Sequence, residues 1–163
     1  MKVTRLAISL LVVLFTATAF AQSDAQATFT KLTSLAGDWS GKTSDGRSVQ
    51  TTYRVTSGGS ALMAEIHSEE DMVTMFHLDG DRLLMTHYCG AGNQPRMVGA
   101  ISPDGKTVTF NYLDATNLLS TQPGHMERLV VTLADSSHYS EEWYFAGKDG
   151  VKQHEVFAMQ RKK

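Results

Sequence analysis

The segment Met72–Met97, MVTMFHLDGDRLLMTHYCGAGNQPRM, contains the strongest evidence for the fold. Two apolar stretches flank Asp79-Gly80, and an Asp-Gly pair in this setting is the strongest short-range signal of a β-hairpin. A Gly-Ala-Gly turn follows the second stretch, and Asn93-Gln94-Pro95-Arg96 opens a further strand. The segment therefore predicts three consecutive antiparallel strands joined by tight turns.

The rest of the chain continues this pattern. Short alternating segments and turns recur at intervals of roughly ten residues, as in an all-β sandwich or barrel. Helical spacing is found in 28–35, where Phe29, Leu32 and Leu35 recur on one face. We expect this short helix and about ten strands, with the polar connection 114–124 as a loop at the rim. The predicted strands are 38–43, 47–56, 61–67, 72–78, 82–89, 94–102, 107–113, 125–134, 138–146 and 151–160.

Several predicted strands carry polar residues on the same face as their apolar ones. His87 and Cys89 share a face with Met85, and Glu141 shares one with Trp143. A sandwich core would exclude carboxylates such as those of Glu141 and Glu155, because burying a carboxylate without a partner costs several kcal/mol. A small barrel with a partly hydrated interior tolerates them and can enclose one ligand. The pattern favours an antiparallel barrel with a cavity, although the opposite phase would place the glutamates in solvent.

The first 21 residues have the pattern of a secretory signal peptide. Lys2 and Arg5 precede the apolar stretch 6–15, and Ala19-Phe20-Ala21 is a small-x-small cleavage signal. The apolar stretch is too short to span a bilayer. We therefore expect cleavage near Ala21 and a secreted or periplasmic protein whose residues 22–163 form a single domain without a membrane span.

The predicted mature domain is mildly acidic. Two of the fifteen basic residues lie in the leader, which leaves 13 against 17 acidic residues and a net charge of −4. This balance argues against nucleic acid or an anionic membrane as the partner, because both are bound by clustered Lys and Arg. Cys89 is the single cysteine, so the domain lacks an internal disulfide and relies on its core for stability. The thiol is either buried and inert or exposed and reactive.

The segment Leu35–Gly41, LAGDWSG, resembles the opening of calycin-type barrels: lipocalins, fatty-acid-binding proteins and nitrobindin-like haem barrels. In those families a short helix leads into a Gly-x-Trp on the first strand, and Gly37 and Trp39 match these positions. The resemblance implies a calycin-like barrel in which Trp39 packs at the closed end beneath Arg161 of the last strand. Such a cation–π pair is worth on the order of 1 kcal/mol. No residue clearly matches the haem histidine of the nitrobindin-like proteins.

The predicted mature chain is also similar to a group of small secreted bacterial proteins. Members carry segments similar to Met85-Thr86-His87-Tyr88-Cys89 and Asn93-Gln94-Pro95-Arg96-Met97. The activity of that group is unassigned, so this resemblance implies membership and no particular reaction.

The predicted function is binding of a small apolar or amphipathic molecule in the barrel. Barrel mouths lie at strand ends and turns, where binding residues concentrate. Arg96 offers a planar fork for a carboxylate or phosphate; alternatively, it pairs with an internal carboxylate such as Glu141. The candidate ligand-binding residues are His87, Tyr88, Cys89, Asn93, Gln94, Arg96, Tyr112, Glu141 and Trp143.

Haem or metal binding through His87 is an alternative. Imidazole and thiolate suit zinc or copper, but a metal site needs at least three protein ligands, and only His77 and His125 offer a third beside Cys89. An enzyme with His87 as general base and a structural or interaction module without a cavity are further alternatives. The sequence contains no nucleophile elbow, phosphate loop or metalloprotease motif. We therefore predict no catalytic residue, metal or cofactor, and the sequence indicates no oligomeric state.

Overall fold

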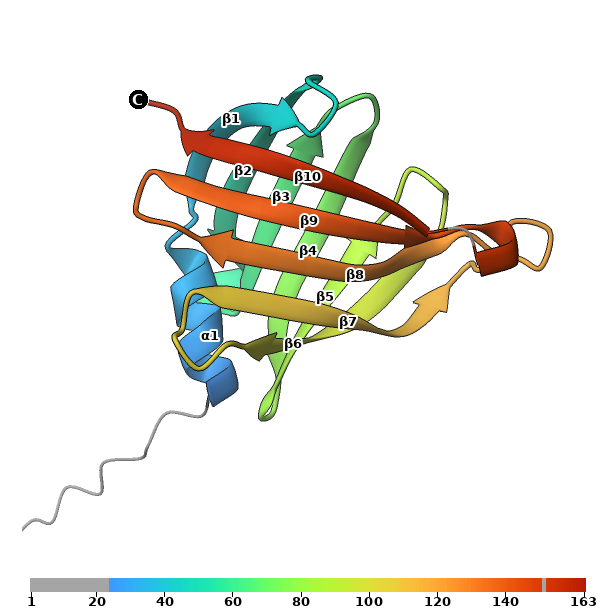
Figure 1. The fold of residues 1–163 in the computed structure, drawn as a ribbon. Helices are drawn as coiled ribbons and strands as arrows, with labels where there is room; N and C mark the ends of the chain where they lie inside the picture. The colour runs from blue at the N-terminus through green and yellow to red at the C-terminus, as the bar shows by residue number, and fades with distance from the viewer. Residues whose placement is uncertain (1–23, 151) are drawn as a thin grey trace, which may run out of the picture.

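The computed structural model describes residues 24–150 and 152–163, which form a closed antiparallel barrel of ten strands with a helix at one end (Figure 1). Each strand pairs with its neighbours in sequence, and β1 pairs with β10 to close the ring. The predicted all-β, calycin-like architecture is thus confirmed. The elements are α1 (Asp24–Thr33), β1 (Gly37–Thr43), β2 (Ser48–Thr56), η1 (Ser57–Gly59), β3 (Ala61–His67), β4 (Asp71–Asp79), β5 (Arg82–Tyr88), β6 (Gln94–Ile101), β7 (Thr107–Thr116), β8 (His125–Leu133), β9 (His138–Ala146), η2 (Lys148–Gly150) and β10 (Lys152–Arg161).

Most predicted boundaries lie within one or two residues of those in the structure, and two differ by more. Helix α1 begins at Asp24 and not at residue 28, because Ala25 and Ala27 favour a helix and an acidic residue in the first turn suits the helix dipole. Strand β7 extends to Thr116 and not to 113, since its last residues still pair with β6. The remaining loop between β7 and β8 is therefore shorter than predicted.

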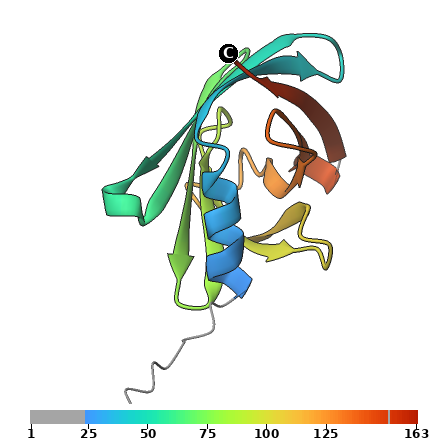
Figure 2. The same ribbon diagram turned by 90° about the vertical axis from the view of Figure 1, so that its left-hand side faces the viewer.

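Helix α1 covers one end of the barrel. It packs against β4, β5 and β6 and buries Phe29 and Leu32, and it lies across the near end of the barrel in Figure 2. Lys31 donates a hydrogen bond from Nζ to the backbone oxygen of Gly105 in the β6–β7 turn. The helix thus closes the end at which β10 finishes and β1 begins.

Trp39 and Arg161 form the centre of this closed end. The Trp39 side chain is buried, and its Nε1 donates to the Leu35 backbone oxygen at 2.7 Å. The Arg161 guanidinium carbon lies 4.2 Å from the centroid of the Trp39 ring, and Nη1 and Nη2 each donate to a backbone oxygen, of Ala36 and Ser34, at 2.8 Å. These contacts join the last strand to the helix–strand connection.

The barrel interior next to this closed end is packed with apolar side chains. Gly41 allows β1 and β10 to approach closely, since a Cβ at this position would lie 2.1 Å from the Ala158 backbone oxygen. His87 and Glu141 are also buried, each with 1% of its surface exposed, so their strands have the inward phase favoured by the sequence. The packed apolar residues include Val49, Leu62, Ala64, Ile66, Phe76, Leu83, Met85, Met97, Val108, Phe110, Leu129 and Val131.

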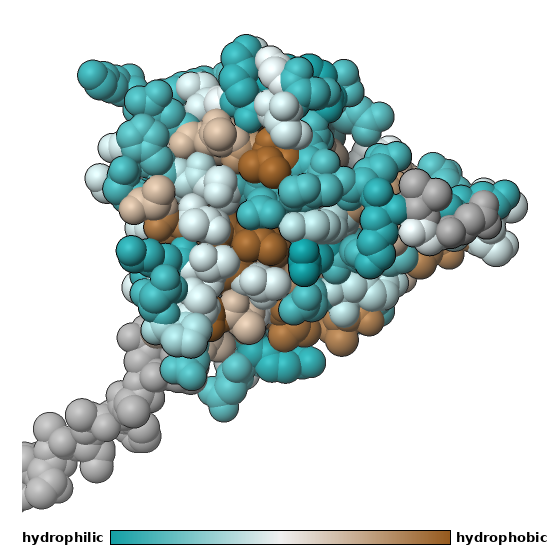
Figure 3. All heavy atoms as spheres, viewed as in Figure 1, coloured by the Kyte–Doolittle hydropathy of each residue, from teal (hydrophilic) through white to brown (hydrophobic). Residues whose placement is uncertain are grey.

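The face of the barrel seen in Figure 3 is mostly polar. On the face shown in Figure 3, hydrophilic residues predominate and hydrophobic ones occur in small groups. None of the described helices is long and apolar enough to cross a membrane. The predicted signal peptide, residues 1–21, lies outside the described residues.

Candidate ligand-binding cavity

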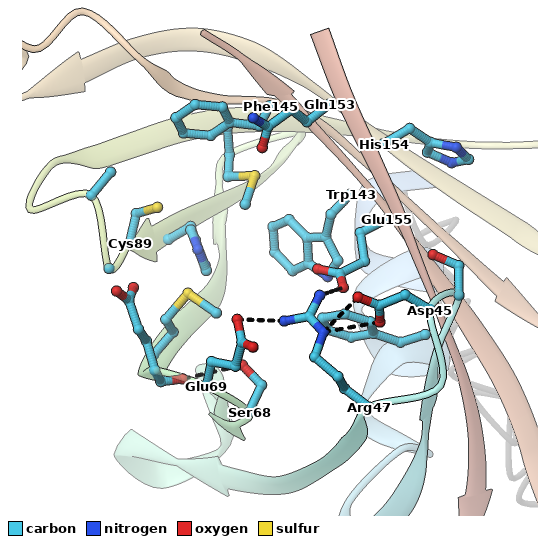
Figure 4. Close-up of a pocket in the computed structure, with 18 of the residues that line it drawn as sticks. Asp45, Arg47, Ser68, Glu69, Cys89, Trp143, Phe145, Gln153, His154 and Glu155 are labelled. Carbon is cyan, nitrogen blue, oxygen red and sulfur yellow. Dashed lines mark hydrogen bonds and ion pairs between the residues drawn. The ribbon is translucent and has the colours of Figure 1, made fainter.

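A cavity of about 800 Å³ opens at the end of the barrel opposite α1 (Figure 4). Its mouth is formed by the turns between β1 and β2, β3 and β4, and β5 and β6, together with the start of β10 and the β7–β8 loop. Its lining is mixed: the apolar and aromatic side chains of Met72, Met126, Trp143, Phe145 and Phe157 lie among polar and charged residues. The volume is in the usual range for small-molecule sites.

His87 is a buried polar group in the floor of this cavity. The β4–β5 hairpin places it directly opposite Thr74, whose Oγ1 lies 2.8 Å from His87 Nδ1. Its ring packs against Trp143, with the ring centroids 4.6 Å apart. The other ring nitrogen, Nε2, is buried and has no hydrogen-bond partner among the described residues. Burial lowers the pKa of His87 to about 4, so the imidazole is neutral at neutral pH.

The hydrogen bonds of this pair indicate which His87 nitrogen carries the proton. The only hydrogen bond of the Thr74 side chain within the described chain is the one to His87. If the Thr74 hydroxyl donates, His87 Nδ1 is satisfied as an acceptor, and only the Nε2 proton lacks a partner. If Nδ1 donates instead, both the hydroxyl proton and the Nε2 lone pair lack partners. Because an unpaired buried polar group costs about 1–3 kcal/mol, the first arrangement is favoured.

Buried Glu141 holds two aromatic side chains in place by accepting hydrogen bonds from them. Tyr53 donates its hydroxyl to Glu141 Oε1 at 2.5 Å, and Trp143 Nε1 donates to Oε2 at 2.7 Å. Burial raises the pKa of Glu141, while the two donors act in the opposite direction. The carboxyl group therefore holds the Trp143 indole, which in turn contacts the His87 ring.

Arg47 lies at the mouth, where it contacts three carboxylates (Figure 4). Its Nε is 2.7 Å from Asp45, Nη1 is 2.5 Å from Glu69, and Nη2 is 2.5 Å from Glu155. These acids come from the β1–β2 turn, the β3–β4 turn and β10, so one guanidinium links three segments of the rim. Partial burial raises the pKa of Glu155, against the lowering effect of Arg47.

The structure brings four of the predicted site residues to the cavity or its support. His87, Cys89 and Trp143 line it, and Glu141 lies beneath. Cys89 is half-buried, and burial raises the pKa of its thiol, with a smaller contribution from nearby Glu70. The thiol is therefore protonated at neutral pH and is a poor nucleophile.

Two further predicted residues shape the rim. The Asn93 side chain is buried, and Nδ2 donates to the Gly124 backbone oxygen at 2.7 Å, which ties the β5–β6 turn to the end of the β7–β8 loop. Gln94 accepts a hydrogen bond from Thr116 on β7 through Oε1 at 2.8 Å. Both residues stabilise the rim, and neither lines the cavity.

The structure does not bring Tyr88, Arg96 or Tyr112 to the cavity. Tyr88 and Tyr112 are exposed, and Arg96 forms an exposed ion pair with Asp114. The suggested pairing of Arg96 with internal Glu141 is therefore wrong. Alternation along β6 puts Met97 in the core and Arg96 on the outer face. Tyr112 pairs with inward-facing Met97, but β7 no longer pairs with β8 beyond Asn111, and the Tyr112 side chain is exposed there.

The described residues contain no group of three or more His, Cys, Asp or Glu side chains that could hold a metal ion. His77, one suggested third ligand, contacts the neighbouring Leu78 backbone oxygen. His125, the other, packs against Tyr112 in a shallow hollow separate from the cavity. A metal site built on His87 and Cys89 is therefore not supported.

The charged group at the mouth, Arg47 with its three carboxylates, was not predicted from the sequence. Arg47 and Glu155 are 108 positions apart, and they meet only because β1 and β10 close the barrel. The turn at Ser44-Asp45-Gly46 was the one available signal, since it places Arg47 at the start of a strand and hence at a rim.

Comparison with known proteins supports the fold. No family model and no curated protein matches this sequence. Among solved structures, Rv2717c from M. tuberculosis is similar, with a TM-score of 0.58 and 14% identity over 83% of this chain and 98% of that one. A structure of EF1p2_mFAP2b bound to DFHBI matches with a TM-score of 0.37 and 12% identity over 87% of this chain and 100% of that one, which is too distant to carry an argument. The likeness to Rv2717c concerns the fold alone.

Proposed function

We propose that this protein is an exported binding protein that holds a small, largely apolar molecule in its barrel cavity. The observation that carries the proposal is a cavity of about 800 Å³ whose lining includes aromatic and methionine side chains together with His87, whose buried Nε2 has no partner among the described residues. Apolar walls with a few convergent polar groups are the usual features of a small-molecule site. Export is supported by the signal-peptide pattern of residues 1–21.

The protonation state of His87 determines which chemical group of a ligand can hydrogen-bond to it. The favoured tautomer has its proton on Nε2, so a bound molecule would place a hydrogen-bond acceptor, such as a carbonyl, ether or hydroxyl oxygen, against this nitrogen. The ring stays neutral at neutral pH because burial lowers its pKa to about 4. The contact would thus be a neutral hydrogen bond inside an apolar cavity.

Direct binding of the neutral dye N-phenylnaphthylamine tests the site. Cys89→Trp places an indole at a lining position, whereas Tyr88→Trp places the same group at the next residue, on the outer face. The dye should bind saturably to the wild type and to Tyr88→Trp, and at least about tenfold more weakly to Cys89→Trp, since about 1.4 kcal/mol of lost contact gives that factor. Absence of saturable binding to the wild type, or equal affinity in both variants, would contradict the proposal.

Native mass spectrometry of protein purified from its own cell envelope complements the dye assay. A molecule that co-purifies with the wild type and is absent from Cys89→Trp would identify the ligand. Amino-terminal sequencing of the same sample tests export, because cleavage near Ala21 should leave an amino terminus near Gln22. A retained leader in the cytosolic fraction would refute export and leave the binding proposal in place.

Haem binding through His87 is a second candidate, favoured by the same unpartnered Nε2 at the cavity. Iron ligation requires the Nε2 lone pair, so Nδ1 would have to carry the proton and donate to Thr74 Oγ1, as ligating histidines donate to a nearby acceptor. Haem titration should then give a Soret band that His87→Ala abolishes and Cys89→Ala retains. A flat spectrum would eliminate this candidate.

A further inference from the structure

We propose that the ligand of this cavity carries a positive charge, such as an ammonium group, at the end that lies in the mouth. This inference rests on the proposed function and adds the charge class of the ligand. It is drawn from the charges at the rim together with the unpartnered nitrogen of His87 in the floor.

The described residues that line the cavity have an excess of negative charge. The lining contains one guanidinium, that of Arg47, and four carboxylates, which gives a net charge of −3 with histidines counted as neutral. The field of these charges is concentrated in the mouth, because the apolar walls have a low dielectric constant. The four acids are Asp45, Glu69, Glu70 and Glu155.

Arg47 is not available as a site for an anionic head group. All three guanidinium nitrogens contact carboxylates: Nε contacts Asp45, Nη1 contacts Glu69 and Nη2 contacts Glu155. The remaining N–H groups of Nη1 and Nη2 could reach an anionic ligand only where it lies beside three carboxylates, whose charge outweighs that of the guanidinium. The arrangement therefore disfavours fatty acids and phosphate esters at this position.

Glu70 is the acid at the rim with no ion-pair partner among the described residues. Its carboxyl group packs on Gly90 of the β5–β6 turn, where a Cβ at Gly90 would lie 1.4 Å from Glu70 Oε2. Burial raises the pKa of the nearby Cys89 thiol, and the charge of Glu70 adds a smaller effect in the same direction. Glu70 is thus placed to receive the positive group.

His87 is the independent evidence that this space receives a ligand. It is 1% exposed, it lines the cavity, and its Nε2 lacks a partner. A molecule that satisfies both ends would place an acceptor near His87, an apolar body along Met126 and Phe145, and a cation at Glu70. These requirements describe a cationic amphiphile with an internal oxygen atom.

Three probes of equal chain length test the charge preference: decyltrimethylammonium, decanol and decanoate, each below its micellar concentration. We would measure their displacement of N-phenylnaphthylamine from the mature protein at low ionic strength. The cation should bind on the order of tenfold more tightly than the anion, with the alcohol between them. In about 1 M salt, where the Debye length is about 3 Å, the preference should nearly disappear.

Glu70→Gln should reduce the preference for the cation several-fold, and the matched control Asp81→Asn, in the β4–β5 turn at the opposite end, should leave it unchanged. Equal binding of all three probes, or tighter binding of decanoate, would overturn this inference and leave the proposed function in place. An unchanged preference in Glu70→Gln would also overturn it. If neither the dye nor any probe bound the wild type, the proposed function itself would fail.

Discussion

Acidification should destabilise this protein through His87. Burial lowers the pKa of His87 from 6.5 to about 4, so the folded state resists protonation while the unfolded state accepts a proton below pH 6.5. The stability contributed by the neutral ring is fully present above pH 6.5 and is lost as the pH falls through 4. A pKa difference of about 2.5 corresponds to about 3 kcal/mol, and 1% exposure of the side chain leaves little solvent screening.

The measurement compares the wild type with His87→Gln by urea unfolding at pH 7 and pH 4. Glutamine retains an amide that can hydrogen-bond to Thr74 but does not titrate. The free energy of unfolding of the wild type should fall by about 3 kcal/mol more than that of the variant. The other titrating groups contribute equally to both proteins and cancel in this difference.

His154→Gln is the matched control, because His154 is exposed at the rim and stacks on Tyr144. Its free energy of unfolding should follow the wild type at both pH values. An imidazole NMR titration of His87 with a midpoint near 6.5 would refute the reasoning. So would a difference of less than about 0.5 kcal/mol between the acid responses of wild type and His87→Gln.

Substitutions at three further positions test the packing around the site and at the closed end. Glu141→Leu should lower the free energy of unfolding by about 2–6 kcal/mol, since two buried donors lose their partner at about 1–3 kcal/mol each. Glu141→Gln can still pair with both donors, and it does not titrate. Because burial raises the pKa of Glu141, the wild type loses stability as the pH rises through that raised pKa, and Glu141→Gln should therefore gain stability relative to it. A larger loss for Gln than for Leu would contradict this in urea unfolding. Arg161→Gln should lower the free energy of unfolding, measured by thermal unfolding, by about 1–3 kcal/mol, because it removes the contact with Trp39 and the hydrogen bonds to backbone oxygens. Dye binding at the opposite end should stay unchanged. Reduced dye affinity would show that the two ends are coupled. Gly41→Ala should cost at least about 2 kcal/mol in urea unfolding or prevent folding, because the added Cβ meets a backbone oxygen of β10; an unchanged unfolding midpoint would show that the two strands can separate.

The fold could be predicted from sequence because the signals for strands are local. Alternation, the Asp79-Gly80 hairpin and regular turns indicate the number of strands without any knowledge of tertiary contacts. The phase of β9 was also readable, because Glu141 alternates with aromatic residues that the barrel buries. The helix start was missed because the prediction relied on apolar spacing from Phe29 onward, whereas Ala25, partly buried against the core, and exposed Ala27 extend the helix through their high helix propensity.

The candidate site was only partly predictable, because it depends on how the ring closes. Arg47 meets Glu155 through the pairing of the first and last strands, which no local pattern encodes. The placement of Arg96 could have been predicted, since alternation from Met97 places it on the outer face. The exposure of Tyr112 could not, because it is in phase with buried Phe110 and is exposed only where β7 stops pairing with β8.

The pair of Thr74 and His87 is difficult to explain by stability alone. An unpaired buried Nε2 proton costs about 1–3 kcal/mol, and replacing both partners by apolar groups of similar shape is often neutral or stabilising. The double variant Thr74→Val/His87→Leu should therefore unfold at an equal or higher urea concentration than the wild type.

If the pair exists for ligand recognition, the same variant should bind a long-chain methyl ketone about tenfold more weakly while binding the alkane of equal length as well as the wild type does. A hydrogen bond of about 1.4 kcal/mol accounts for that factor, and only the ketone can accept it from His87. Equal losses for the two molecules would mean that the substitutions changed the cavity shape. A loss of stability without a loss of ketone affinity would assign the pair to folding, because its contribution would then be made before any ligand enters.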